Sequence, residues 1–137
     1  MPSRSTTTFS WIRLLPMLGW MMFIFWASHQ TETEINDQSW VYQTFQFIGS
    51  YFPADKLVHG VVYGILGSLG ALAMIHRPWL NWVICVIYGM SDEFHQSFIP
   101  GRSVEAMDVL ADAVGAGVMI FLIFSMTRTI CSQKGHQ

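Results

Sequence analysis

Residues 57–75 read LVHGVVYGILGSLGALAMI, a run that is apolar apart from His59. A helix needs roughly 20 mainly apolar residues to cross a hydrocarbon core of about 30 Å, and this run approaches that length. Two runs of the same kind lie at residues 11–28 and 109–126. The chain therefore contains three segments that have the length and the composition of transmembrane helices.

A fourth apolar run, residues 79–90, is too short to span by itself. It reaches a spanning length only if its helix continues through the polar stretch SDEFHQ at 91–96. We therefore predict an all-α fold, a four-helix transmembrane bundle that forms a single domain over residues 1–137. The spans are expected at about 11–28, 57–76, 79–97 and 107–127.

The composition supports this class. Hydrophobic residues make up 52% of the 137 residues and charged residues only 12%, about half the usual share of a soluble domain. The mean hydropathy is +0.37. The formal net charge of −2 offers no basic excess for neutralising phosphates, so we expect membrane lipid, and no nucleic acid, as a partner.

The charged residues segregate between the two predicted membrane faces. If the first helix starts in the cytoplasm, five basic residues fall on that side: Arg4, Arg13, Arg77, Arg128 and Lys134. The other side carries Lys56, Arg102 and all nine acidic residues. Because basic residues near span ends stay in the cytoplasm, we predict a multi-pass protein of the cytoplasmic (inner) membrane, with both termini inside and the acidic face extracytoplasmic.

The segment between the first two spans has a helical pattern of its own. Its apolar residues recur every three or four positions: Trp40, Val41, Phe45, Ile48 and Phe52. This spacing is typical of an amphipathic helix, which we place at about 37–49 on the extracytoplasmic membrane surface. The alternative is a packed loop.

Ionisable side chains inside a membrane are costly and are treated as functional candidates. Here they share helix faces, because residues four apart lie above one another. The shared faces carry Asp55, His59 and Tyr63 on the second helix, Asp92, His95 and Gln96 on the third, and Asp108 and Asp112 on the fourth. We predict that they form one polar pocket open to the extracytoplasmic face, with Glu93 and Glu105 turned toward the headgroups.

The residue types in this pocket suit acid–base or metal chemistry. Imidazole titrates near neutral pH and binds metals, and carboxylates bind divalent cations. The predicted catalytic residues are His59, Asp92, His95 and Asp108. The cofactor is left open, with a divalent metal as one candidate and its potential ligands being His59, Asp92, His95, Asp108 and Asp112. The structural alternative is ion pairing of the aspartates with Lys56 and Arg102.

A tight turn is expected at residues 99–103, which would bring Arg102 over the pocket mouth. The planar guanidinium of arginine suits a phosphate or a carboxylate. The predicted substrate-binding residues are Lys56, Tyr63, Gln96 and Arg102.

Small residues recur on two of the helices: Gly60, Gly64, Gly67 and Gly70 on the second, and Ala111, Gly115 and Gly117 on the fourth. Such positions let helix backbones approach closely in lipid. Contact between these helices would bring His59 within reach of Asp108 or Asp112.

The ordered set of motifs resembles the VanZ-like family of membrane proteins over residues 55–120. The matching pieces are Asp55-Lys56 with His59 and Tyr63, SDEFHQ at 91–96, Pro100-Gly101-Arg102, and Asp108 with Asp112 and Gly115. Asp112 stands where the family pattern often carries Asn. The name-giving member is associated with resistance to the glycopeptide antibiotic teicoplanin, so the resemblance implies a role in the cell envelope and brings no defined reaction.

Three functions remain open. The first is an enzyme that hydrolyses or transfers a phosphate or ester of a lipid-linked envelope precursor. The second is a non-enzymatic accessory protein that recognises a glycopeptide, a lipid or a partner protein. The third is an ion or proton pathway, which the nearly apolar inner halves of the helices disfavour.

Overall fold

The computed structural model describes residues 11–29 and 54–134, and in these ranges the chain is helical with no strand. The elements are a 3-10 helix, Trp11–Leu14, followed by α1 (Leu15–Ser28), α4 (Ala54–Ala73), α5 (Pro78–Gln96) and α6 (Ala106–Lys134). The predicted all-α fold with four helices is therefore confirmed. The amphipathic segment predicted at 37–49 lies outside the described residues.

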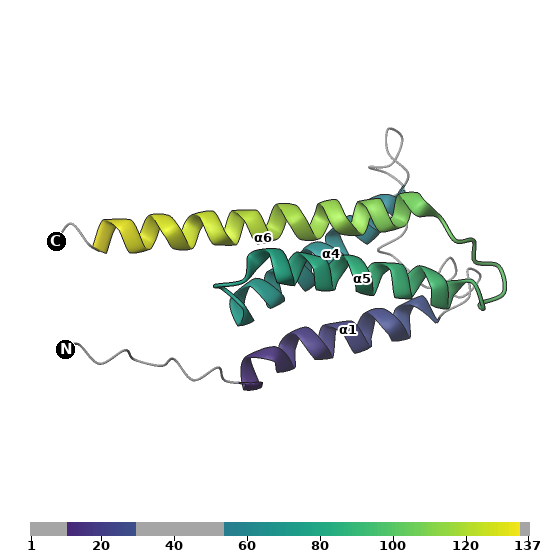
Figure 1. The fold of residues 1–137 in the computed structure, drawn as a ribbon. Helices are drawn as coiled ribbons and strands as arrows, with labels where there is room; N and C mark the ends of the chain where they lie inside the picture. The colour runs from purple at the N-terminus through teal and green to yellow at the C-terminus, as the bar shows by residue number, and fades with distance from the viewer. Residues whose placement is uncertain (1–10, 30–53, 135–137) are drawn as a thin grey trace.

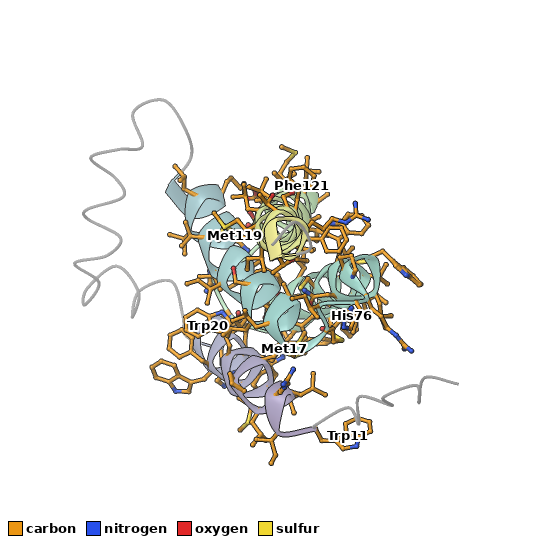
Figure 2. All side chains as sticks on the ribbon, turned by 90° about the vertical axis from the view of Figure 1, so that its left-hand side faces the viewer. Trp11, Met17, Trp20, His76, Met119 and Phe121 are labelled. Carbon is orange, nitrogen blue, oxygen red and sulfur yellow. The ribbon has the colours of Figure 1, made fainter. Side chains whose placement is uncertain are left out.

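The four helices alternate in direction, as Figure 1 shows. The end of α1, the start of α4, the end of α5 and the start of α6 consequently meet at one end of the bundle, on the right of that view. Helix α6 packs against α4 and α5, and α1 packs against the same two helices. Figure 2 looks along the bundle and shows α1 and α6 on opposite sides of the α4–α5 pair.

Three helical segments are long and apolar enough to cross a membrane: Trp11–Ser28, Asp55–Ala73 and Ala106–Thr129. Helix α5 is not among them, because its last turns read SDEFHQ. Its polar side chains Asp92, Glu93 and Gln96 are buried against the other helices, as expected for polar groups inside a membrane protein. The chain is therefore a membrane protein in which the polar end of α5 is buried against the neighbouring helices.

The closest backbone approach joins α4 to α6. A Cβ atom added at Gly115 would lie 2.0 Å from the carbonyl oxygen of Gly60, and one at Gly67 would lie 2.9 Å from that of Ala116. Only glycine permits such contacts, because any side chain would overlap the facing backbone. The predicted small-residue packing between these helices is confirmed at these positions.

Two of the predicted glycines face α5 instead. A Cβ at Gly70 would lie 1.9 Å from Oδ1 of Asn81, and one at Gly117 would lie 3.2 Å from Nε1 of Trp82. Asn81 is fully buried, and its Nδ2 donates a hydrogen bond to the carbonyl of Gly67 at 2.8 Å. These glycines therefore make room for side chains that join α5 to its neighbours.

Helix α1 is an integral part of the bundle. The indole N–H of Trp20 donates to the carbonyl of Val62 at 3.0 Å, and the hydroxyl of Tyr88 donates to the carbonyl of Met21 at 2.5 Å. Met17 is buried in the core, and Figure 2 shows Met17 and Trp20 on the side of α1 that faces α4.

The connection between α5 and α6 contains the predicted turn. The N–H of Arg102 donates to the carbonyl of Ile99 at 3.2 Å, and Gly101 has φ of 83°. Proline at the second position and a positive-φ glycine at the third define a type II turn. The turn over residues 99–102 returns the chain from the polar end of α5 to the start of α6.

Replacing Gly115 by alanine should weaken the bundle, because the new methyl group would overlap the Gly60 carbonyl. We expect a loss of about 3 kcal/mol, the upper end of ordinary overpacking. The matched control is Gly19→Ala in α1, where an added Cβ meets nothing within 4 Å. Thermal unfolding in detergent, followed by tryptophan fluorescence, checks this. Equal melting temperatures for the two variants would contradict it.

Candidate functional site

Most buried polar residues belong to the end of the bundle where α1 and α5 finish and α4 and α6 begin. This end is on the right of Figure 1. Apart from Asn81, the buried polar and charged residues of the described chain all lie there: Ser28, Asp92, Glu93, Gln96, Asp108 and Asp112. Four carboxylates shielded from solvent need compensation by hydrogen bonds, cations or protons. Asp112, Asp108 and Asp92 each belong to a separate group of contacts, and Glu93 lies beside the first two groups.

The first group is the pair formed by His59 of α4 and Asp112 of α6. The distance from His59 Nδ1 to Asp112 Oδ1 is 3.0 Å, and Asp112 is only 1% exposed. The pair lies beside the Gly60–Gly115 contact, which holds the two helices close enough for the side chains to meet. The prediction that helix packing brings His59 to an aspartate of the last helix is confirmed.

The second oxygen of Asp112 lies against Gly89 of α5, where an added Cβ would be 2.8 Å from Asp112 Oδ2 and 3.4 Å from the ring of Tyr63. Asp112 Oδ2 and the hydroxyl of Tyr63 are both buried with no hydrogen-bond partner among the described residues. Tyr63, predicted to bind substrate, is therefore a core residue beside the His59–Asp112 pair.

The second group surrounds Lys56. Its ammonium lies 3.0 Å from Asp55, 2.5 Å from Glu105 and 2.5 Å from Asp108. The hydrogen bond from Lys56 lowers the pKa of Glu105, which lies just before α6. The structural alternative of ion pairing therefore describes Asp108 in part, with Lys56 as the cation.

Glu93 corrects a prediction. It was expected to face the headgroups, but it is 2% exposed. The connection after α5 folds back over it, so that its Oε2 accepts the backbone N–H of Glu105 at 3.0 Å. One ligand atom each from His59, Glu93 and Asp108 lie within 4.8 Å of one another. Glu93 therefore belongs to the site, between α4 and α6.

The third group joins α5 to α1. Ser28 donates a hydrogen bond to Asp92 Oδ2 at 2.9 Å, and Gln96 donates to the same oxygen at 3.3 Å. The ring of His95 stacks on Phe25 with centroids 4.5 Å apart, and its Nε2 lies 3.3 Å from Nδ1 of His29.

His95 was predicted to share one pocket with His59, which stays a prediction; its ring contacts Phe25 of α1 and His29, the residue that follows α1. The shared face of Asp92, His95 and Gln96 is correct, but this face meets α1. The contribution of Ser28 and His29 was missed by the sequence reasoning. The sequence did contain a sign of this contribution. The first apolar run ends in Ser28-His29, which the predicted topology places at the same membrane face as the acidic residues.

Arg102 lies in the turn at the same end of the bundle and is half-buried. Its Nε is buried without a hydrogen-bond partner, and no ion pair with it occurs within the described ranges. The ion pair between Arg102 and an aspartate, which was one of the structural alternatives, is therefore absent from this part of the chain.

The comparisons with known proteins can now be set beside this geometry. A family model described as VanZ/LLP1 matches residues 13–128. No curated protein and no solved structure matches the chain. The matched range contains α1, α4, α5 and α6 as far as Arg128, and with them every residue of the three groups, together with Glu93 and Arg102.

Replacing Lys56 by methionine removes the cation that three carboxylates share. We expect a loss of about 2 kcal/mol, below the 3–5 kcal/mol of a fully buried broken pair, because the side chain of Lys56 is 16% exposed. The control is Asp55→Asn, whose side chain is 49% exposed and should matter little. Thermal unfolding in detergent near pH 7 makes the comparison, and a Lys56→Met variant as stable as the control would refute this account.

Proposed function

Because the chain belongs to the VanZ/LLP1 family, we propose that it acts as an enzyme of the cell envelope. The reaction is hydrolysis or transfer at a phosphate or ester group of a lipid-linked precursor, at the extracytoplasmic face of the cytoplasmic membrane. The observation that carries this proposal is the buried pair of His59 and Asp112, with Nδ1 and Oδ1 3.0 Å apart. Paired titratable groups in a low-dielectric setting are typical of catalytic centres.

Asp112 gives His59 a defined role. A carboxylate that accepts the Nδ1–H of an imidazole fixes the ring orientation and the tautomer. The lone pair of Nε2 is then available for a proton or for a metal ion. His59 is part-buried, with 16% of its side chain exposed, so that a reactant can reach it. This arrangement suits activation of a water molecule or of a substrate hydroxyl.

Arg102 supports an anionic substrate. Its half-buried guanidinium has no acidic partner within the described ranges, and the planar fork of arginine binds phosphate or carboxylate through two parallel hydrogen bonds. Lys56 is less suited to this role, because its ammonium already contacts three carboxylates. We therefore assign anion binding to Arg102 first.

The surroundings of the site suit a lipid substrate. Phe94, Phe98 and Met107 lie at the polar end of the bundle and are each more than half exposed. In a membrane protein such side chains face lipid, so a lipid chain can lie against the bundle while its polar head reaches the site. The family resemblance to a teicoplanin-resistance protein favours an envelope precursor as that lipid.

A binding role is the second candidate, and one observation favours it. Lys56 already pairs with Asp55, Glu105 and Asp108. Part of the acidic cluster is therefore neutralised within the protein, as is typical of ion pairs with a structural role. Under this candidate the chain recognises a glycopeptide, a lipid or a partner protein without turnover. Shape-preserving changes such as Asp112→Asn would then weaken binding gradually.

The proposed orientation has a direct test. In a Cys131→Ser background, Ser103→Cys should react with a membrane-impermeant maleimide in intact cells, and Thr129→Cys should react only after the membrane is opened. Both positions are exposed and lie at opposite ends of the bundle. The native Cys85 is buried and should remain unlabelled. Labelling of Thr129→Cys alone in intact cells would reverse the orientation.

The enzymatic proposal predicts turnover by the purified protein in lipid nanodiscs. The probes are a polyprenyl diphosphate, assayed for released phosphate, and phospholipids, assayed for released fatty acid. His59→Gln should lower the rate by roughly 10²–10⁴-fold, the usual contribution of general acid–base groups. His95→Gln, on the α1 side, should stay within a few-fold of the unmodified protein. Absence of turnover on both probes, or equal effects of the two substitutions, would count against the enzyme.

A further inference from the structure

We propose that a divalent transition-metal ion, of the Zn²⁺ or Mn²⁺ type, binds between α4, α5 and α6. Its ligands are His59, Glu93 and Asp108, one from each helix. The inference rests on the proposed function in one respect, since it names the cofactor of the same site. Its own evidence is the placement of the three side chains.

The three ligands already lie nearly close enough. One ligand atom each from His59, Glu93 and Asp108 are within 4.8 Å of one another. Ligand atoms about 2.1 Å from a tetrahedral ion lie roughly 3.5 Å apart. The separations therefore exceed the tetrahedral value by at most about 1.3 Å.

The burial of Glu93 is a second observation that points to a bound cation. It is 2% exposed, and its Oε2 is held by the backbone N–H of Glu105 at 3.0 Å. Its Oε1 is buried and has no hydrogen-bond partner among the described residues. A buried carboxylate oxygen without a partner is unfavourable. A cation between Glu93, His59 and Asp108 would remove that cost.

A second group of acidic residues shows the contrast. Ligand atoms of Asp55, Glu105 and Asp108 also lie within 4.8 Å of one another, but the ammonium of Lys56 contacts all three carboxylates. That group already contains its cation. The group around Glu93 shares Asp108 with Lys56, but Glu93 itself has no lysine or arginine in ion-pair contact in the described ranges. The metal therefore belongs to the Glu93 group and not to the Lys56 group.

Asp112 supports the proposed site by orienting the ring of His59. Metal-binding histidines commonly donate their other ring N–H to a carboxylate, which orients the ring. His59 has this arrangement with Asp112, so Nε2 is the nitrogen left for the metal. A set of one imidazole and two carboxylates suits Zn²⁺ or Mn²⁺ better than Ca²⁺, which prefers oxygen ligands alone.

The test is metal binding by the full chain in detergent, without substrate. After dialysis against a chelator, the protein is titrated with Zn²⁺ and with Mn²⁺, and bound metal is measured by mass spectrometry and by the Mn²⁺ electron paramagnetic resonance signal. We expect one ion per chain. Glu93→Gln and His59→Ala should weaken binding at least 100-fold, and Asp112→Asn should weaken it about 10–100-fold.

Two control variants show whether the loss of binding is specific to the proposed ligands or follows from the loss of any negative charge or any histidine. Asp55→Asn and His95→Ala should bind as the unmodified protein does, because Asp55 belongs to the Lys56 group and His95 contacts α1. The unmodified protein, loaded with Co²⁺, should also show visible absorption bands typical of nitrogen and oxygen ligands. This measurement does not depend on the folding of any variant. Binding below one ion per chain, or equal losses for His95→Ala and Glu93→Gln, would overturn the site.

The two proposals can fail separately. Metal binding with no turnover on either lipid probe would support the metal site and refute the proposal that the protein is an enzyme acting on those substrates. Turnover that persists in metal-free protein, with no metal binding in the titration, would refute the metal site and support the enzymatic proposal.

Discussion

The approach of α4 to α6 at Gly60 and Gly115 is the constraint on which the polar end of this protein depends. A Cβ at Gly115 would lie 2.0 Å from the Gly60 carbonyl, so the two backbones touch where His59 and Asp112 project between them. A larger separation would leave a buried carboxylate and an imidazole unpaired in a low-dielectric interior, where each is costly. The small residues thus set the helix distance, and that distance sets the chemistry.

Compensation of charge then divides the acidic residues by function. Asp108 lies between a lysine that neutralises it and the site of Glu93 and His59. Asp92 accepts hydrogen bonds from Ser28 and Gln96 on Oδ2, and its Oδ1 is buried without a hydrogen-bond partner among the described residues. Glu93 has one oxygen held by a backbone N–H and the other without a partner. Asp112 also has a buried oxygen without a hydrogen-bond partner among the described residues. Two incompletely hydrogen-bonded carboxylates thus accompany His59, and a cation beside them would offset the cost of burying them.

The sequence predicts the helices well because long apolar runs and Gly spacing are local signals. It also predicts that His59 meets an aspartate of the last helix, since the glycines beside both residues require close contact. It is wrong for Glu93 and does not predict that His95 contacts α1, because spacing tells which residues share a helix face and not which neighbour that face meets. The direction of Glu93 depends on the fold-back of the turn at 99–102, and that of His95 depends on the position of α1, which no periodicity within α5 reports.

The depth of the polar end bears on the choice between a site and a pathway. Below His59 and Asp112, towards the other end of the bundle, the buried side chains are apolar or weakly polar, among them Leu66, Cys85, Ala116 and Ile120. Asn81 is the one strongly polar side chain buried there in the described chain, and its amide is engaged with the Gly67 carbonyl. A proton or an ion would meet tightly packed apolar core where a pathway needs polar steps. Among the described residues, the buried ionisable side chains thus lie at one end of the bundle, which is the arrangement that the proposed lipid substrate would need.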